Sequence, residues 1–259
     1  MNRIGEAFAR GKAFIPFITC GDPDLETTGK IVRAMQENGA DLIELGIPFS
    51  DPVAEGPVIQ DANLRALSRK ITTDDIFDFV AGLRKDITVP LVFMTYANVV
   101  FSYGSARFAS RCRETGISGL ILPDVPFEEK EEFAPVCQEY GLDLISMIAP
   151  TSAQRIARIA AQATGFLYIV SSLGVTGVRS EITTDIASIV QLAKENTSCP
   201  CAVGFGISTP EHAAAMASLS DGAIVGSAIV KLAAEYGRDA AAVIGPFVRE
   251  MSAAVHGAP

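Results

Sequence analysis

Eight short apolar segments recur along this chain of 259 residues, and they restrict its fold more than any other feature. Most of them are apolar at consecutive positions, as strands buried on both faces of a sheet should be. The segments between them carry apolar residues at helical spacing. The predicted strands cover residues 14–19, 42–46, 91–96, 119–123, 143–148, 166–170, 201–205 and 222–225, and the predicted helices cover residues 26–38, 74–84, 128–140, 152–163, 184–195 and 211–217.

Strict alternation of strands and helices predicts a parallel sheet with right-handed crossovers. Eight such units in about 250 residues match the size of a (β/α)8 barrel, and a doubly wound open sheet is the alternative. No linker or short repeat divides the chain, so we expect one domain over residues 1–259. An extra N-terminal helix at residues 3–10 precedes the first strand, and an Ala-rich segment at 229–255 follows the last.

The charge balance is acidic, with 30 Asp and Glu against 21 Lys and Arg and a net charge of −9. No basic cluster stands out, which argues against nucleic acid and anionic membrane surfaces as partners. No apolar run reaches the ~18–20 residues of a membrane-spanning helix. The N-terminal segment reads as the start of an amphipathic helix without the apolar core of a signal peptide. We therefore expect a cytoplasmic protein.

The five cysteines and two histidines offer little for catalysis or metal binding. Cys199 and Cys201 are separated by one proline, which is not the spacing of a zinc site. We expect reduced and mostly buried thiols. We also expect His212 on the surface and His256 in a frayed chain end. Acid–base chemistry would then have to use carboxylates, Tyr or Lys.

The stretch at residues 41–61, DLIELGIPFSDPVAEGPVIQD, holds the strongest candidates for a site. It begins as a strand, in which alternation places Glu44 on the inward face of the sheet. An acid in such a place costs stability unless it is paired, hydrated or used. The remainder is predicted to be a loop, because its Pro and Gly residues disfavour a helix or a central strand. Asp51 and Glu55 lie in this loop, at the carboxyl ends of the strands, where barrels place their active sites.

Each acid near the strand ends also has a purely structural interpretation. Glu44 is the best acid–base candidate, and the alternative is a structural carboxylate satisfied by a neighbour. Glu55 either approaches the same site or stays a solvated loop acid, and Asp51 could cap a turn. We expect Asp22 and Asp124 to fix turns. Because these acids lie on different loops with no histidine among them, we expect no metal site.

Three glycine-bearing segments follow the last three predicted strands and suggest a phosphate site. Thr176 and Gly177 follow the sixth strand, Gly206 follows the seventh, and Gly226 and Ser227 open a helix after the eighth. Glycines allow close approach of the backbone to a ligand, and successive N–H groups at a helix start attract an anion. Barrels commonly bind phosphate at these loops. Taken singly, each glycine could simply form a turn.

Six segments closely resemble the tryptophan synthase alpha subunit family, in order and without large gaps up to the GSAIV segment at 226–230. They are PFITCGDPD at 16–24, ELGIPFSDPVAEGPVIQDA at 44–62, MTYANVVF at 94–101, LPDVPFEE at 122–129, LGVTGVRSE at 173–181 and GFGIS at 204–208. The resemblance implies a (β/α)8 barrel that cleaves indole-3-glycerol phosphate to indole and glyceraldehyde 3-phosphate. It implies no cofactor in this chain and a beta subunit partner that carries pyridoxal phosphate, joined as an alpha2beta2 complex.

The resemblance also implies roles for individual residues. The catalytic glutamate of the family falls on Glu44, and its second catalytic acid, an aspartate in the family, falls on Glu55, which is one methylene longer. Phe17, Ile59 and Met94 match apolar positions beside the indole ring, Tyr168 matches a tyrosine near the glutamate, and Thr176 matches a threonine of a mobile loop. The matching phosphate positions are Gly177, Gly206, Gly226 and Ser227.

Two further interpretations stay open at this point. The barrel and phosphate site would also suit another sugar-phosphate isomerase or epimerase. A glutamate at position 55 would suit a subunit that activates its beta partner and has weak activity of its own. The segments at 48–57 and 94–101 are expected at the partner interface on resemblance alone.

Overall fold

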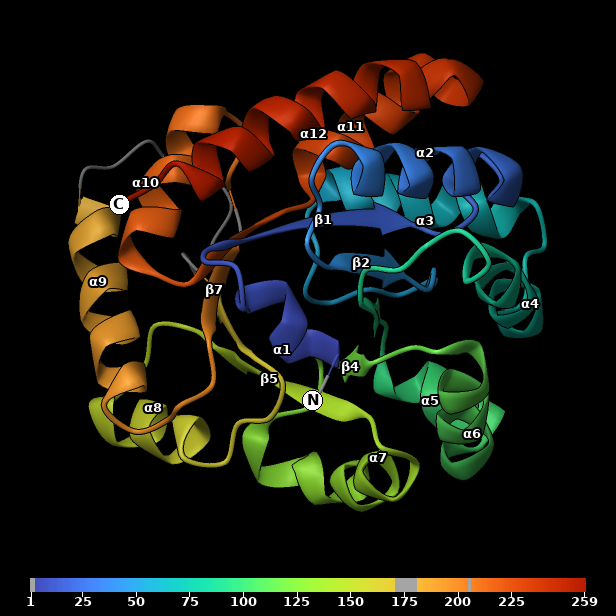
Figure 1. Ribbon diagram of the computed structural model, residues 1–259. Coiled ribbons are helices and arrows are strands. Elements are labelled where there is room, and N and C mark those ends of the chain that lie inside the picture. The colour runs from blue at the N-terminus through green and yellow to red at the C-terminus, as the bar shows by residue number, and fades with distance from the viewer. Residues whose placement is uncertain (1–2, 171–180, 205) are drawn as a thin grey trace.

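The computed structural model describes residues 3–170, 181–204 and 206–259, and within them it shows a closed barrel of eight parallel strands (Figure 1). Each strand pairs with the next in the sequence, and β8 pairs with β1. The predicted barrel is confirmed, and the open sheet is wrong. The strands are β1 (Ala13–Thr19), β2 (Ile43–Gly46), β3 (Leu91–Met94), β4 (Gly119–Ile121), β5 (Asp143–Ile148), β6 (Leu167–Val170), β7 (Cys201–Gly204) and β8 (Gly222–Val225).

Helices surround the barrel in the places that the apolar spacing predicts, with three additions between strands. Those that match predictions are α1 (Arg3–Phe8), α2 (Leu25–Glu37), α4 (Thr73–Leu83), α7 (Ala134–Tyr140) after the 3-10 turn η1 (Phe127–Glu132), α8 (Ala153–Ala160), α9 (Glu181–Lys194) and α10 (Pro210–Leu219). The Ala-rich end forms α11 (Ser227–Tyr236), the 3-10 turn η2 (Gly237–Asp239) and α12 (Ala240–His256). The additions are α3 (Pro57–Ser68), α5 (Ala97–Tyr103) and α6 (Ser105–Thr115).

The start of α3 corrects one prediction. The loop predicted through residue 61 ends at Gly56, because Pro57 occupies the first position of a helix. Proline is tolerated there, since the N–H that it lacks would have no partner within the helix and its fixed φ suits the helical turn. The helix places Ile59 and Asn63 near the strand ends, whereas a loop would not have fixed their positions.

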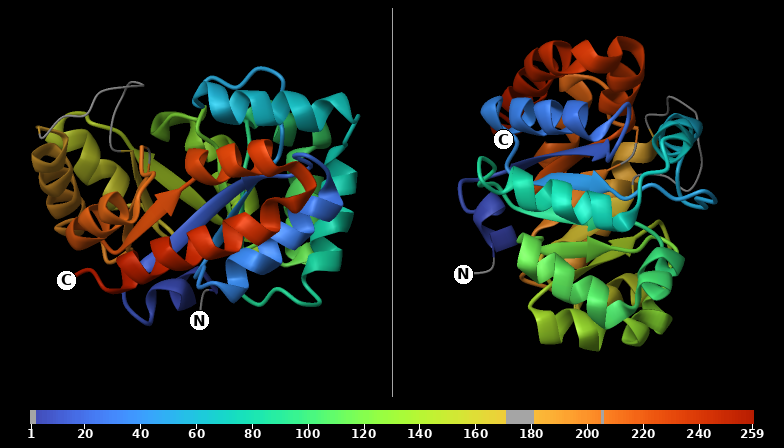
Figure 2. Two further views of the ribbon diagram at one scale, coloured as in Figure 1. Left: turned by 90° about the horizontal axis from the view of Figure 1, so that it is seen from above. Right: turned by 90° about the vertical axis from the view of Figure 1, so that its right-hand side faces the viewer.

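Helix α1 closes the amino-terminal end of the barrel. Ile4 lies against Gly119 at the start of β4, and the ring of Phe8 lies 5.9 Å from that of Phe166, just before β6. Figure 2 shows α1 and the N-terminus on one side of the barrel and the segment after β2 on the opposite side. The carboxyl-terminal end of the barrel is therefore the end at which a substrate can enter.

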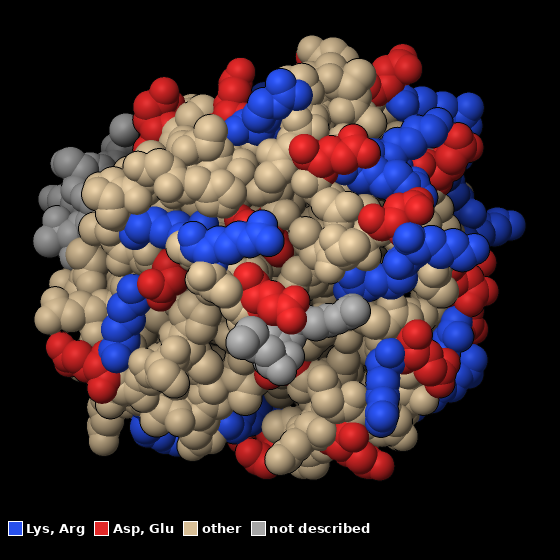
Figure 3. Space-filling view, viewed as in Figure 1, with Lys and Arg blue, Asp and Glu red and all other residues tan. Residues whose placement is uncertain are grey.

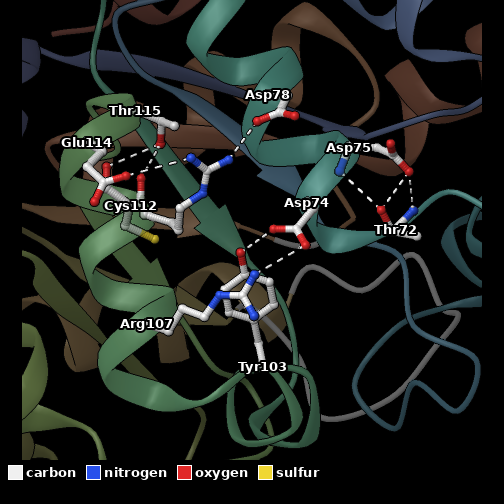
Figure 4. A network of polar contacts seen from close by, with 10 residues as sticks. Thr72, Asp74, Asp75, Asp78, Tyr103, Arg107, Cys112, Glu114 and Thr115 are labelled. Carbon is white, nitrogen blue, oxygen red and sulfur yellow. Dashed lines mark hydrogen bonds and ion pairs between the residues drawn. The ribbon is translucent and has the colours of Figure 1, made fainter.

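Surface contacts hold the outer helices to one another. Arg107 on α6 and Tyr103 at the end of α5 both contact Asp74 on α4, and Arg111 on α6 pairs with Asp78 on α4 at 2.7 Å (Figure 4).

Acidic and basic side chains are mixed over the face that carries α1 (Figure 3). This mixture agrees with the absence of a basic cluster from the sequence.

The chain end is ordered, contrary to the prediction for His256. This residue ends α12, where its Nε2 lies 2.7 Å from Asp41 Oδ2, and the same oxygen accepts the backbone N–H of Phe14 at 2.8 Å. Helix α12 packs along α2 and α10, so tertiary contacts hold the end of the chain in place. His212 is exposed, as predicted.

The other bulk predictions concern the thiols, metal ligands and membrane. All five cysteines are free, and all but the half-buried Cys199 are buried, as predicted. Within the described ranges, no group of three or more His, Cys, Asp or Glu side chains is arranged to hold a metal ion. None of the helices described has the length and apolar character needed to cross a membrane.

Candidate active site

Glu44 occupies the inside of the barrel on β2, as alternation predicts. Its side chain is almost fully buried at 1 % exposure, opposite Phe17 of β1 in the strand register. Burial raises the pKa of its carboxyl group to about 8, because a charge there has lost its water. Among the described residues, its Oε1 has no hydrogen-bond partner. A carboxyl group in this state can hold a proton near neutral pH and pass it on.

Tyr168 on β6 lies close to Glu44 and depends on a glycine for its place. Its pKa is raised, first by burial and second by the charge of Glu44, which lies near enough to act on the phenol. A Cβ on Gly204 of β7 would lie 2.5 Å from the Tyr168 hydroxyl oxygen. The glycine therefore makes room for the phenol beside the carboxyl group.

Phe17 and Met94 line the same end of the barrel. The ring of Phe17 covers Gly46, where a Cβ would lie 2.7 Å from its Cζ, and its Cβ lies near Gly226. Met94 pairs in register with Gly46. Both side chains are buried, so they offer apolar surface next to Glu44. Ile59, on the first turn of α3, is partly buried and packs against the barrel core.

Glu55 lies in the segment just before α3 and is held by polar side chains. Asn63 Nδ2 donates to its Oε2 at 2.7 Å, and Gln60 Nε2 donates to its backbone carbonyl oxygen at 2.7 Å. The pKa of Glu55 is raised by burial, while hydrogen bonds from Asn63 and Tyr96 act in the opposite direction. The structure thus makes Glu55 a partly buried, oriented acid and excludes the solvated alternative.

Tyr96 supports the same loop from the end of β3. Its hydroxyl oxygen accepts the N–H of Ala54 at 3.3 Å, and Phe49 stacks on its ring at 5.1 Å between centroids. Burial, and then the charge of Glu55, raises its pKa, so the phenol stays protonated and can act as a donor. Asp51 is exposed and contacts only the adjacent Ser50 hydroxyl among the interactions seen.

Asp22 and Asp124 have different roles. Asp22 is fully buried and forms a two-pronged pair with Arg65 of α3, at 2.8 Å for each contact. Its buried charge needs a cation in the absence of water, so its side chain joins the segment after β1 to α3. Its backbone N–H donates to the carbonyl oxygen of Thr19 at 3.4 Å within the turn after β1. Asp124 accepts the N–H of Ala97 at 3.1 Å, which fixes the start of α5.

The predicted phosphate residues lie in part outside the described ranges. Thr176 and Gly177 fall in the segment that is not described. Gly206 has φ of +74°, which favours glycine, and Gly226 precedes Ser227 at the start of α11. The first N–H groups of a helix have no partner within it, so this end can receive an anion.

Four residues of the site were not predicted from the sequence, and the sequence carries a signal for only one of them. Tyr96 follows Met94 by two positions at a strand end, where alternation could have found it. Asn63 and Gln60 lie in a helix that was predicted to be a loop up to residue 61, so no periodic pattern pointed to them. Gly204 shows its function only in three dimensions, where a tyrosine from another strand fills the space of its missing side chain.

A closed (β/α)8 barrel with a buried carboxyl group inside it, and a second oriented acid in the segment before α3, is the architecture of a barrel enzyme whose carboxylates are available as acid and base. The sequence matches the family described as "Tryptophan synthase alpha chain" over residues 7–255. The chain therefore belongs to the tryptophan synthase alpha chain family.

Individual relatives agree with this membership. The tryptophan synthase alpha chain of Lactiplantibacillus plantarum is 50% identical over 258 residues, covering 99% of this chain and 97% of the relative. The solved alpha subunit of Legionella pneumophila superposes with a TM-score of 0.89 at 39% identity, covering 98% of both chains. A chain from the tryptophan synthase a2b2 complex of Pyrococcus furiosus gives a TM-score of 0.85 at 36% identity, covering 93% of this chain and 98% of that one.

Proposed function

We propose that this chain cleaves indole-3-glycerol phosphate to indole and glyceraldehyde 3-phosphate, and that Glu44 moves the protons. The observation that carries the proposal is the buried Glu44 carboxyl group, with a pKa of about 8 and an unpartnered oxygen among the described residues. Family membership favours this lyase reaction over a sugar-phosphate isomerization.

The reaction is a retro-aldol cleavage. Protonated Glu44 gives its proton to indole C3, and the ring becomes cationic. The resulting carboxylate then takes the proton of the hydroxyl on the glycerol carbon bonded to C3. The C–C bond breaks, its electron pair returns to the ring, and the hydroxyl oxygen becomes the aldehyde oxygen. One carboxyl group thus serves as acid and then as base, which a pKa near neutral pH allows.

Glu55 stabilises the cationic ring in this proposal. A fixed carboxylate near the indole N–H offsets the positive charge that C3 protonation creates. The apolar surfaces of Phe17, Ile59 and Met94 hold the indole ring, and the phenol of Tyr168 lies near Glu44. The N–H groups at Gly206, Gly226 and Ser227, with Gly177, hold the phosphate and so position the scissile bond, and Thr176 contributes to substrate binding.

We further propose that the chain works with a beta subunit. Its support is the likeness to a chain of the Pyrococcus furiosus a2b2 complex. Val53 and Phe101, exposed at 77 % and 54 %, lie within the segments at 48–57 and 94–101 that the resemblance assigns to the interface. The reaction of this chain uses no cofactor in this proposal, and pyridoxal phosphate belongs to the partner. The cytoplasm is the expected compartment.

Incubation of the purified chain with indole-3-glycerol phosphate tests the proposal. We expect free indole from the wild type, a higher rate after addition of a beta subunit, and no indole from Glu44→Gln with its fold intact. Glu26→Gln, a change of an exposed glutamate on α2, is the matched control and should leave the rate unchanged. Absence of indole with and without a beta subunit would refute the function, and turnover by Glu44→Gln would remove Glu44 from the mechanism.

A further inference from the structure

We infer that Asn63 is a positioning residue that fixes the carboxylate of Glu55, and that helix α3 is the rigid element that holds this acid in place. The inference rests on the proposed function, in which Glu55 faces the indole ring. It assigns a role in the reaction to a helix side chain that lies eight residues beyond the acid it orients.

Helix α3 holds Glu55 at two points. Asn63 donates to the carboxylate and Gln60 to the backbone carbonyl oxygen of the same residue, both at 2.7 Å. Asn63 is 3 % exposed, so its amide does not exchange freely with water. A buried amide that donates to a charged oxygen makes one of the stronger hydrogen bonds in proteins. The two contacts together hold the backbone of Glu55 and the carboxylate at the end of its side chain.

The helix itself is anchored to the barrel. Arg65 stands two residues after Asn63 and binds both oxygens of the fully buried Asp22, in the segment after β1, at 2.8 Å each. This planar two-pronged contact restricts rotation as well as distance. Through Asn63, α3 and Arg65, the position of Glu55 is therefore fixed relative to β1, the strand that carries Phe17.

Apart from the contacts of Tyr96 with Ala54 and Glu55, the segment before α3 offers little to fix the Glu55 side chain. Val53 is 77 % exposed and Asp51 is also exposed, so the segment lies at the surface. Glutamate has three rotatable side-chain bonds, and ordering such a side chain costs conformational entropy. Asn63 supplies a fixed donor that offsets this cost before a substrate arrives.

A double-mutant cycle in indole release tests the inference. We expect Asn63→Ala to lower kcat roughly tenfold, the usual scale for loss of a hydrogen bond to a charged group. In Glu55→Asp the carboxylate withdraws by about one C–C bond, ~1.5 Å, from the Asn63 amide. Asn63→Ala should then lower kcat less than twofold in that background. Asn196→Ala, an exposed asparagine bonded to a helix carbonyl at the end of α9, is the matched control.

The outcomes separate the inference from the function on which it depends. No indole from the wild type would refute the function. An active wild type matched by Asn63→Ala would overturn the inference. Equal losses from Asn63→Ala in the wild-type and Glu55→Asp backgrounds would also overturn it, because a merely structural role would act on both. Urea unfolding of each variant shows whether it is folded.

A substrate-free titration gives an independent measurement. Asn63 hydrogen-bonds to Glu55 and lowers the pKa of its carboxyl group against the effect of burial. Carbon-13 NMR of the Glu55 carboxyl group should therefore show a higher pKa in Asn63→Ala than in the wild type and no change in Asn196→Ala. An unchanged pKa would overturn the inference, and this titration alone decides if Glu55→Asp proves inactive.

Discussion

The hydroxyl of Tyr168 occupies the space that a side chain on Gly204 would take: a Cβ there would lie 2.5 Å from its oxygen. The two residues come from neighbouring strands, β6 and β7. The tyrosine reaches across the barrel interior toward Glu44, which lies on β2 on the opposite side. The absence of a side chain on one strand thus determines the environment of the acid on another.

We predict that Gly204→Ala lowers both stability and indole release. The buried phenol must move away from the new methyl group, and such overpacking costs about 1–3 kcal/mol. Urea unfolding measures the stability and the indole assay measures the rate. Gly82→Ala on α4 is the control, because nothing lies within 4 Å of a Cβ there. Equal behaviour of the two variants would show that Gly204 does not set the place of Tyr168.

The burial of Glu44 should make stability depend on pH. Its carboxyl group has a pKa of about 8 in the folded chain against 4.5 for the free side chain. Below pH 4.5 both states are protonated. Between these values only the unfolded state ionises, so the wild type should lose about 1.4 kcal/mol per pH unit relative to Glu44→Gln. Above pH 8 the difference should stay constant.

Chemical unfolding of the wild type and Glu44→Gln at pH 5 and pH 8 measures this difference. Glutamine is similar in size and has no charge to bury, so its advantage over the wild type should grow with pH. A gap between the two that is the same at both pH values would mean that Glu44 is ionised in the folded chain at pH 5.

Indole release should fall as pH rises through about 8. The proposed first step needs the protonated form of Glu44, and that form is lost above the pKa of the group. A profile of kcat/KM against pH for the isolated chain measures the midpoint. A rate that rises through pH 8 would instead require the carboxylate as the starting form.

Loss of Arg65 should destabilise the chain more than loss of a similar arginine on the surface. Arg65→Ala leaves the buried Asp22 without its cation, and we expect a cost of about 2–3 kcal/mol, reduced from the fully buried case because the arginine is partly exposed. Arg33→Ala removes an equivalent contact with exposed Asp86 and should cost ~1 kcal/mol or less. Urea unfolding compares them, and equal costs would contradict the anchoring role of Asp22.

The chain end should contribute measurably to stability. His256→Ala removes the contact with Asp41, which also holds the backbone of β1, and we expect a loss of about 0.5–1 kcal/mol because the imidazole is partly exposed. His212→Ala on the exposed start of α10 is the control and should change little. If both variants unfold at the wild-type urea concentration, the contact of His256 adds nothing to stability.

The sequence by itself determined the barrel and the inward position of Glu44. Eight apolar segments in strict alternation with helices leave few other arrangements, and period-two alternation fixes which face of a strand each residue occupies. The local order of residues also determined the positive φ at Gly206 and the helix start at Gly226, since these depend on backbone freedom and helix ends rather than on distant contacts.

Only the tertiary structure decided how the second acid is held. Asn63 on α3 donates to Glu55 in the segment before that helix, Arg65 on α3 binds Asp22 in the segment after β1, and His256 contacts Asp41 across 215 positions of sequence. Each of these contacts joins residues through side-chain packing, for which the chain carries no periodic signal. Periodicity reports the face on which a residue lies, whereas the partner it meets is set by how the elements close around one another.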